Sequence, residues 1–476
     1  MKFSILIPVY NERYLVAELV ARALAAPLPE GLERELIIVD DGSTDGSRAI
    51  LEKLAAEHPR EVVYLPQDRN RGKGAAVRTA IARATGEFCV FQDADLEYDP
   101  REYPKLLEPL LSGHADAVYG SRYLPGVQRR RILYFWHTVG NHILTTLSNM
   151  CTDLNLSDME TCYKVFRTEV LKTIPLRSQR FGIDPEVTAK VAKRGLRVYE
   201  VPISYDGRTY LEGKKITWRD GLQALWVILK YWLMDDVYDE RTAPEYVTDL
   251  ARAHRVNRWV ADTLRPYLGE RVLEIGAGLG MLAGRLLPRE RYIVSESREA
   301  CLVVLRNLAL HCKGLEVARV EPQAAADLEP FRGRVDTVLC ANLLHRLKDP
   351  AAALRNFHEV LEPGGRLVLL AAQGPWLLGA LDETLEHARR YSREALAAEL
   401  RAAGFTVERL HDFNRAGVPG WFLNGTLLRR RRMPKVQLKA YDATVWFWRR
   451  TDWLLPWRGL SLVAVARKEG QPGCPS

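Results

Sequence analysis

The sequence lacks a long hydrophobic run of the kind that spans a membrane. Its longest apolar stretch near the middle, residues 222–234, is interrupted by Gln223, Lys230 and Tyr231, whereas a bilayer crossing needs roughly 20 apolar residues. The first residues, MKFSILIPVYNE, contain a short apolar run and no cleavage-site pattern, which predicts a first strand and not a signal peptide. We expect residues 222–234 to form an amphipathic or core helix that could lie at a membrane surface.

The sequence also lacks paired cysteines. Its seven cysteines are scattered, odd in number and without CxxC spacing, which argues against a disulfide framework and against a zinc site. Core or free thiols fit a reducing compartment. We therefore expect a cytoplasmic protein.

The length of the chain and the distribution of its charge indicate more than one domain. With 476 residues it is too long for one ordinary core, so two or three domains are expected. Its 47% hydrophobic and 27% charged residues are typical of a soluble globular protein. Residues 1–240 carry 32 Lys and Arg against 34 Asp and Glu, and the remaining residues carry 36 against 26. The net charge of +8 therefore belongs to the second half.

An apolar run followed by acidic residues marks the centre of the first half. Phe88–Phe91 reads as a buried parallel strand, and Asp93 and Asp95 follow it. Ligands bind at the carboxyl ends of such strands. Crowded carboxylates repel one another unless a cation neutralises them, and their hard oxygens suit Mg²⁺ or Mn²⁺ beside a phosphate. The alternative is an acidic turn that caps a helix near Pro104.

Further apolar runs alternate with helical patterns and predict a parallel sheet. Asp41 ends the second strand and could accept hydrogen bonds from a base or ribose. The stretch RGKGAA at 71–76 opens a helix whose small residues let its N-terminus approach an anion, although it is no P-loop. A charged, proline-containing break follows. We predict a first domain over 1–236, a linker over 237–246 and a second domain over 247–470.

Four stretches of the first half, PVYNE, VDDGSTDGS, RNRGKGAA and DADLE, resemble the family 2 glycosyltransferases of GT-A fold, in the family's order. The stretches YGSRY, SDMETCYKVFR, FGIDPEV and ISYDGRTYLEGKK are most similar to the polyprenyl-phosphate glycosyltransferases. The resemblance implies an α/β nucleotide-sugar-binding domain, a UDP- or GDP-linked sugar as donor, and polyprenyl phosphate or a lipid-linked glycan as acceptor.

The resemblance also implies site residues. The nucleotide-sugar would be held by Pro8, Tyr10, Glu12, Asp41, Lys73, Asp93 and Asp95, and the metal by Asp93, Asp95 and Glu97. A phosphate acceptor arrives ionised and needs no base, so catalysis would rest on Asp93, Asp95 and the cations Arg122, Arg208 and Lys214.

A transferase with a hydroxyl acceptor is the alternative, with Asp184 or Glu186 as base. We favour Asp184 as the N-cap of a helix that has Pro185 at its first position. Residues 124–156 are basic and then aromatic, which fits either a core helix or an acceptor helix at a membrane.

The second half begins with a strand and three glycines, RVLEIGAGLG. This stretch, together with VDTVLCANLLH and LEPGGRLVLL, resembles the class I methyltransferases that use S-adenosylmethionine. The resemblance implies a second Rossmann-like α/β domain. It also implies a cofactor site made by Glu274, Gly276, Gly278, Gly280, Glu296 and Asn342.

Three features of this half stay open. Asp327 is a candidate for touching adenine or a surface helix residue, and His345 is a candidate base or, more in keeping with a single histidine after a strand, a structural residue. Residues 414–459 form an insertion before the last strand in which arginines and lysines alternate with tryptophans. Such a surface could bind nucleic acid, sugars or an anionic membrane.

A membrane or lipid-linked partner fits the first half better than nucleic acid does. We therefore expect a bifunctional enzyme on the cytoplasmic face of a membrane, which transfers a sugar to polyprenyl phosphate and methylates a related glycan or lipid-linked product. The alternative makes the second domain a non-catalytic module that docks on a membrane or partner.

Overall fold

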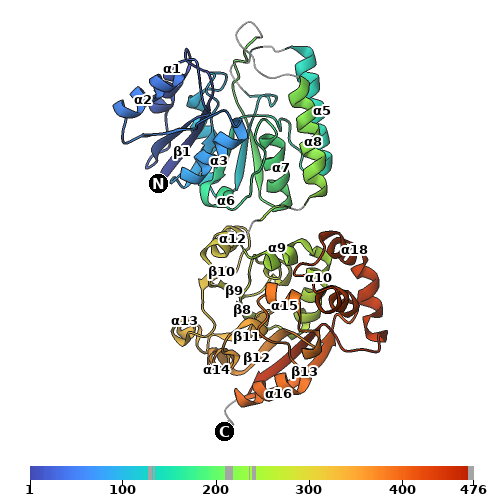
Figure 1. The fold of residues 1–476 in the computed structure, drawn as a ribbon. Helices are drawn as coiled ribbons and strands as arrows, with labels where there is room; N and C mark the ends of the chain where they lie inside the picture. The colour runs from blue at the N-terminus through green and yellow to red at the C-terminus, as the bar shows by residue number, and fades with distance from the viewer. Residues whose placement is uncertain (127–130, 132–133, 210–217, 235, 239–242, 470–476) are drawn as a thin grey trace. The chain divides into compact units, whose positions relative to one another are not determined.

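The computed structural model describes residues 1–126, 131, 134–209, 218–234, 236–238 and 243–469. The chain divides into two compact units, Met1–Asp239 and Glu240–Ser476 (Figure 1). Each unit contains a seven-stranded mixed sheet with helices on both faces. The prediction of two α/β domains is therefore confirmed.

The sheet of the first unit has the strand order β3-β2-β1-β4-β6-β5-β7. Its members are β1 (Lys2–Val9), β2 (Glu33–Asp40), β3 (Val62–Pro66), β4 (Phe88–Phe91), β5 (Ala117–Ser121), β6 (Lys164–Arg167) and β7 (Val198–Pro202). Strand β6 runs antiparallel to its neighbours β4 and β5, whereas β1 runs parallel to β2 and β4. The central strands are buried on both faces, as their continuous apolar sequences predict.

Eight α-helices of the first unit lie in the described residues. They are α1 (Val16–Ala25), α2 (Ser47–Glu57), α3 (Lys73–Arg83), α4 (Tyr103–Leu111), α5 (Phe135–Thr152), α6 (Thr168–Lys172), α7 (Ile183–Lys193) and α8 (Trp218–Leu233). Helices α5 and α8 lie side by side at one edge of this unit (Figure 1). The helix expected over 222–234 thus begins four residues earlier.

The sheet of the second unit has the order β10-β9-β8-β11-β12-β14-β13. Its strands are β8 (Arg271–Ile275), β9 (Arg291–Glu296), β10 (Leu315–Arg319), β11 (Val335–Ala341), β12 (Leu361–Ala372), β13 (Phe405–Phe413) and β14 (Ser461–Lys468). Strand β14 runs antiparallel to both of its neighbours, β12 and β13, and the other paired strands of this sheet run parallel to each other. The insertion expected between the last two strands is confirmed, because β13 ends at Phe413 and β14 begins at Ser461.

The described helices of the second unit cover its sheet and form the insertion (Figure 1). They are α9 (Glu245–Arg252), α10 (His254–Leu264), α11 (Ala283–Leu286), α12 (Glu299–Ala309), α13 (Ala325–Leu328), α14 (Pro350–Val360), α15 (Ala380–Thr384), α16 (Arg393–Ala402), α17 (Gly417–Trp421) and α18 (Lys435–Thr451). Ala253 separates α9 from α10.

Candidate functional site

Three neighbouring strands of the first unit end at one edge of their sheet. Strands β1, β2 and β4 are parallel, so the segments that follow them lie together. These segments carry Glu12 after β1, Asp41 after β2, and Asp93 and Asp95 after β4. The structure thereby brings together four of the carboxylates that the sequence singles out.

Two cations meet these carboxylates. Lys73, at the start of α3, lies 2.7 Å from Asp93 Oδ1. Arg208 lies 2.8 Å from Asp95 Oδ2, 3.3 Å from Glu97 Oε1 and 3.5 Å from Glu12 Oε2. Tyr205 also donates a hydrogen bond to Glu97. Carboxylates from two strand ends therefore converge on a single guanidinium.

The carboxylates remain crowded in spite of these cations. Burial, together with the nearby charges of Glu97 and Asp93, raises the pKa of Asp95 to about 7. Burial also opposes the ionisation of Asp93, but the adjacent Lys73 ammonium holds the pKa of that carboxyl below its ordinary value. A divalent cation would relieve the repulsion at Asp95.

The carboxylates at this edge suit a hard metal ion that takes only some of its ligands from the protein. Asp93 and Asp95 offer carboxylate oxygens, which Mg²⁺ and Mn²⁺ prefer. Among the described residues, however, no group of three or more His, Cys, Asp or Glu side chains is gathered as a metal site. The residues fit a metal that takes its remaining ligands from water or from a phosphate.

Asp41 holds the turn that begins α3. Its two oxygens accept hydrogen bonds from the backbone N–H groups of Arg71 and Gly72, each at 2.8 Å. Gly72 has φ +92°, and a Cβ there would collide with the backbone of Gln179. This turn places Lys73 beside Asp93. Pro8 lies at the end of β1 beside Val39, and Tyr10, which follows, is exposed.

Arg122 forms a buried ion pair of its own. Its Nε and Nη2 atoms donate to the two oxygens of Asp158 at 2.6 and 2.7 Å, and Asn141 shares the same site. Because both partners are buried and of opposite charge, this pair holds the segment after β5 to the segment that follows α5. The Arg122 guanidinium also lies over the ring of Tyr205, 5.1 Å from its centroid, and Tyr205 is the residue that donates to Glu97. Lys214 lies outside the described residues.

Asp184 and Glu186 are both buried and both neutralised by lysines. Asp184 lies 2.6 Å from Lys164 Nζ, and Glu186 lies 2.7 Å from Lys190 Nζ. Glu186 also accepts hydrogen bonds from two backbone N–H groups. The N-cap interpretation of Asp184 is wrong, because α7 begins at Ile183 after an N-cap at Gly182 and the Asp184 carboxyl is drawn to Lys164.

Glu160 is a carboxyl that the sequence analysis missed. Burial and the nearby charge of Asp184 raise its pKa to about 7. Its Oε1 atom is buried without a hydrogen-bond partner in the part of the chain that the structure describes. A local sequence motif could not reveal the raised pKa of Glu160, because the pKa is raised by burial in the folded chain.

In the second unit, the candidate site at the sheet edge is formed mainly by the backbone of a glycine-rich turn. Gly276, Gly278 and Gly280 have φ of +72°, +59° and +77° in the turn after β8. A Cβ would lie 2.7 Å from Leu343 at the first position and 2.8 Å from Leu308 at the third. The positive φ angles favour glycine at all three positions, and a Cβ at the first or third would also displace a leucine side chain.

Glu296, at the end of β9, supports this turn. Its Oε2 accepts a hydrogen bond from the Gly278 N–H at 3.0 Å, so its carboxyl lies directly against the glycine loop. Asn342, after β11, has φ +56° and donates its N–H to Leu370 O. Strands β9 and β11 both run parallel to β8, so the segments after these three strands lie at one edge of the sheet.

A cavity of about 170 Å³ opens at this edge. It is smaller than the roughly 300–1,000 Å³ of common ligand pockets. Glu321 and Pro322, after β10, belong to its lining, whereas Asp327 instead accepts a hydrogen bond from the Glu321 N–H. The lining residues are Gly276, Glu296, Ser297, Arg298, Val320, Glu321, Pro322, Leu343, Arg346, Leu347 and Glu386.

Glu274 faces the interior of the second unit. Tyr292 donates a hydrogen bond of 2.9 Å to its carboxyl, which is 3% exposed as a residue. Burial raises the pKa of Glu274 to about 7. The structure therefore pairs this residue with a tyrosine, and it is not among the residues that line the cavity.

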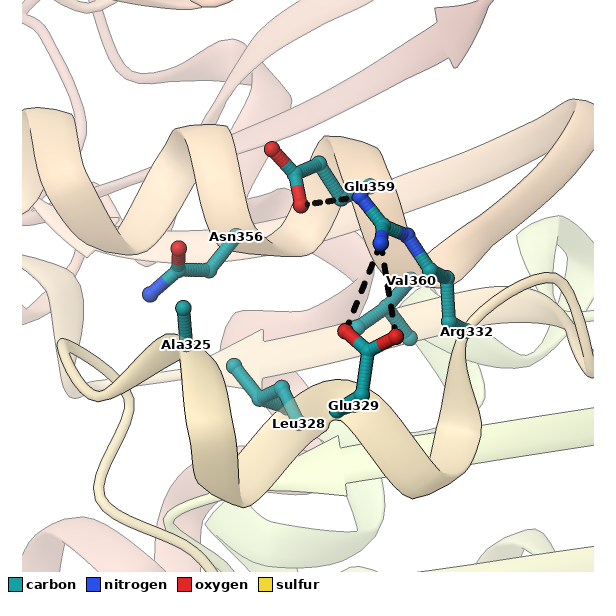
Figure 2. A pocket seen from close by; sticks show the side chains of 7 residues that line it. All are labelled: Ala325, Leu328, Glu329, Arg332, Asn356, Glu359 and Val360. Carbon is teal, nitrogen blue, oxygen red and sulfur yellow. Dashed lines mark hydrogen bonds and ion pairs between the residues drawn. The ribbon is translucent and has the colours of Figure 1, made fainter.

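A second hollow lies between α13, the turn after it and α14 (Figure 2). Arg332 bridges Glu329 at 3.3 Å and Glu359 at 2.8 Å across it. Its volume of about 10 Å³ approaches the minimum that one water molecule needs. It is not a site for an organic ligand.

Apolar side chains are exposed on the paired helices of the first unit. Leu222, Trp226, Leu229 and Leu233 are exposed at a spacing of four, three and four along α8, and Phe135, Trp136, Ile143 and Met150 are exposed on α5. In the second unit, the insertion exposes Trp446, Phe447, Trp453, Leu454 and Trp457. Within the described ranges, none of the helices has both the length and the apolar character needed to cross a bilayer.

Two family models match the chain. Residues 4–174 match the model of Glycosyl transferase family 2, and residues 247–410 match that of a Methyltransferase domain. Among curated relatives, the chain is 30% identical over 211 residues to an undecaprenyl-phosphate 4-deoxy-4-formamido-L-arabinose transferase of Edwardsiella ictaluri, which covers 44% of this chain and 62% of that protein. It is 29% identical over 221 residues to a dolichol-phosphate mannosyltransferase of Pyrococcus furiosus, covering 45% and 61%. The chain thus spans about three fifths of the length of these relatives.

Solved structures are similar to parts of the chain. The glucosyl-3-phosphoglycerate synthase of Mycobacterium tuberculosis, in complex with Mn²⁺, UDP and phosphoglyceric acid, is 19% identical with a TM-score of 0.39, over 49% of this chain and 80% of that one. A putative methyltransferase of Bacillus halodurans is 20% identical with a TM-score of 0.30, over 42% and 93%.

Proposed function

Since the chain carries a family 2 glycosyltransferase domain and a C-terminal methyltransferase domain, we propose that it transfers a sugar from a UDP- or GDP-linked donor to polyprenyl phosphate and methylates a related glycan or lipid-linked product. The observation that carries the first part is the convergence of Lys73 and Arg208 on the carboxylates after β1 and β4. Curated relatives with the names of undecaprenyl-phosphate and dolichol-phosphate transferases support the lipid acceptor.

The state of the carboxylates supports a phosphate acceptor. A hydroxyl nucleophile needs a base that takes its proton, whereas a phosphate is already ionised. Asp184 and Glu186 are held by buried lysines and are poor bases. The reaction needs cations that bring two anions together and stabilise the departing diphosphate. Lys73 and Arg208 are the described residues that we assign to that task.

A divalent metal, Mg²⁺ or Mn²⁺, would be held by Asp93 and Asp95. When bound it would neutralise charge on the donor diphosphate. Glu97 is engaged by Arg208 and Tyr205, so we assign it to positioning Arg208. Glu12, Pro8, Tyr10 and Asp41 lie at the same sheet edge, and we propose that they border the nucleotide, with Asp41 acting through the turn before Lys73.

The apolar face of α5 and α8 supports a lipid-linked acceptor. Tryptophan and leucine at helical spacing bury well at a membrane interface, and Lys230 on α8 is suited to head groups. We propose that the protein contacts the cytoplasmic face of a membrane peripherally through this face. The exposed tryptophans and basic residues of the insertion in the second unit would add a second contact.

The second domain would bind S-adenosylmethionine at the glycine turn. Gly276, Gly278 and Gly280 allow close approach of a ligand to the backbone, Glu296 is suited to ribose hydroxyls, and Asn342 lies at the same edge. The cofactor would supply a methyl group on a sulfonium. We propose that Glu274 supports the glycine turn indirectly, because its hydrogen bond from Tyr292 joins β8 to β9.

The test is a two-stage assay of the intact protein. Short polyprenyl phosphate is incubated with a panel of UDP- and GDP-sugars in Mg²⁺, Mn²⁺ or chelator, and the lipid product is then offered with methyl-labelled S-adenosylmethionine. Metal-dependent transfer followed by labelling of the same lipid is the expected result. Transfer without labelling, together with no binding of S-adenosylmethionine in calorimetry, would reduce the second domain to a docking module.

One observation favours a second candidate function for the first domain. Glu160 has a pKa raised to about 7 and an unpartnered carboxyl oxygen within the described residues, which suits a general base. A hydroxyl acceptor would use such a base. Substituting Glu160 by Gln therefore separates the two acceptors.

A further inference from the structure

A cluster of polar side chains covers the ends of β11 and β12 in the second unit. The segment after α15 crosses these ends, where the Ala388 and Arg389 N–H groups donate to His345 O at 3.1 and 3.2 Å. Arg390 donates to Gln373 O at 2.8 Å, directly after β12. The segment that contains His387 is thus fixed to the edge of the sheet by its backbone.

Within this cluster, His387 and Asp382 form a dyad. His387 Nδ1 lies 2.7 Å from Asp382 Oδ1, and the Asp382 side chain is 1% exposed. Arg390 Nε donates to the same oxygen at 2.8 Å, and the Gly379 N–H donates to the other at 3.0 Å. An ionised carboxylate only accepts hydrogen bonds, so the hydrogen of the imidazole belongs on Nδ1 and the lone pair on Nε2.

The Nε2 atom of His387 is available for chemistry. It has no hydrogen-bond partner among the described residues, and the side chain is 13% exposed. The His345 ring stands perpendicular to it at 4.3 Å, and the Trp421 ring lies parallel to it at 6.2 Å. The rings of His345 and Trp421 thus flank the His387 ring on two sides.

Residues adjacent in sequence to His387 and His345 line the cavity at the glycine turn. Glu386 and Arg346 line that cavity together with Gly276 and Glu296. They pair with each other at 2.7 Å and are the sequence neighbours of His387 and His345. Two buried nitrogens of the same cluster, His345 Nε2 and Trp421 Nε1, have no partner within the described residues. Such unpaired buried groups favour a polar ligand that completes them.

We propose that His387 is the general base of methyl transfer, oriented by Asp382, and that the methyl acceptor is a sugar hydroxyl. This inference rests on the proposed methyltransferase function. His387 Nε2 takes the hydroxyl proton while the oxygen forms its bond to the methyl carbon, and the electrons of the broken carbon–sulfur bond stay on sulfur. The proton then leaves to solvent. A carboxylate acceptor would need no such base.

The charges around the ring keep it in the basic form. Burial lowers the pKa of His387, the adjacent Arg390 and Arg346 guanidiniums lower it further, and Asp382 only partly offsets them. Burial and the neighbouring His387 lower the pKa of His345 well below its ordinary value. Both rings are therefore neutral at neutral pH. Arg390 remains paired with Asp382, while His345 Nδ1 accepts the Ala372 N–H, which gives it a positioning role.

The first test uses the protein without an acceptor. Nitrogen-15 NMR of histidine-labelled protein at pH 7 should show His387 as the neutral Nδ1–H tautomer, and Asp382→Ala should abolish that preference. A protonated His387, or the Nε2–H tautomer, would overturn the proposal. Calorimetry with S-adenosylmethionine alone tests the proposed methyltransferase function separately. If the wild type does not bind S-adenosylmethionine, that proposed function fails, whereas the tautomer result is unaffected.

The second test compares acceptor chemistry with octyl glucoside, octyl glucuronide and octyl glucosaminide as probes. The glucoside hydroxyls should be methylated, and His387→Ala should lower the rate by about 10²–10⁴-fold while binding of S-adenosylmethionine is retained. Added imidazole should restore part of the rate, which a merely structural loss would not allow. His254→Gln, at an exposed histidine of α10, serves as the matched control. Preferred methylation of the glucuronide carboxylate, labelling of none of the three probes, or full activity of His387→Ala would contradict the proposal.

Discussion

The two units place their candidate sites on the same kind of sheet edge but build them from different materials. In the first unit, four carboxylates meet two cations, and Arg208 alone contacts three of the acids. In the second unit, left-handed glycines and one carboxylate form the turn, and the histidine of a histidine–aspartate dyad follows Glu386, which lines the cavity at that turn. Similar α/β sheets thus support two chemistries, because the segments after the strands supply the reactive groups.

The difference follows from the charges that each site has to handle. Under the proposed function, two phosphate-bearing substrates would carry several negative charges into the first site, to be matched by lysine, arginine and metal. In the second site, a sulfonium and a hydroxyl would bring one positive charge and a proton to be removed. The Asp95 carboxyl is costly to keep ionised in isolation, as its raised pKa shows, whereas Glu296 rests against a backbone N–H.

The largest effect is expected from Asp95→Asn. Removing the carboxylate that we assign to the metal should lower kcat/KM for sugar transfer on the order of 10³-fold, since a metal supplies several kcal/mol of charge stabilisation. Methyl transfer should stay unchanged. Asp99→Asn is the matched control, because Asp99 belongs to the same stretch but caps the turn at Pro100. Equal losses in both variants would contradict the assignment.

The second effect concerns the arginine at the centre of the first site. Arg208→Ala should lower sugar transfer by about 10²–10³-fold, the cost of removing one group that stabilises developing charge. Arg22→Ala, which removes an exposed pair with Glu18 on α1, should leave the rate unchanged. Steady-state kinetics with varied acceptor measure the loss. A normal rate for Arg208→Ala would remove Arg208 from the mechanism.

Glu274→Gln tests the interior of the second unit. The rise of the Glu274 pKa from 4.5 to about 7 means that the folded state favours the protonated carboxyl, so the wild type loses stability as the pH rises from 4.5 through 7. At about 1.4 kcal/mol per pKa unit, Glu274→Gln should be more stable than the wild type by about 3 kcal/mol at pH 8 and equal to it at pH 4.

Hydrogen exchange of the β8 and β11 amides in the intact protein measures this difference in pH dependence. Binding of S-adenosylmethionine should be nearly unchanged in Glu274→Gln, because the amide keeps the hydrogen bond from Tyr292. A large loss of cofactor affinity without a change in stability would instead assign Glu274 to direct cofactor contact.

The smallest effect is expected from Glu160→Gln. If the acceptor is a phosphate, no base is needed, and sugar transfer should stay within about threefold of the wild-type rate. The pH profile between 6 and 8 should also keep its shape. A loss of about 10²-fold or more would establish Glu160 as a general base and favour the hydroxyl acceptor.

The sequence predicts those parts of the fold that local patterns determine. The strand Phe88–Phe91 is predicted at its observed bounds, because an apolar run meets Asp93 after one residue. The insertion over 414–459 is also confirmed, since it lies between β13 and β14. The glycines of 276–280 indicate a tight turn by themselves, and all three have positive φ in the structure.

Pairings between distant residues are what the sequence does not reveal. Arg122 pairs with Asp158, 36 positions later, and Asp184 pairs with the buried Lys164 and does not cap its helix. The perturbed carboxyl of Glu160 and the dyad of His387 and Asp382 arise in the same way, from burial and from contacts that only the folded chain creates.

The central claim is that the first domain transfers sugar to a phosphate and not to a hydroxyl. The most direct measurement offers one prenyl chain in two forms, polyprenyl phosphate and the free polyprenol, to the intact protein with the donor panel and Mn²⁺ in the same detergent. We expect transfer to the phosphate alone, lost with chelator and in Asp95→Asn. Transfer to the polyprenol at a comparable rate would contradict the account.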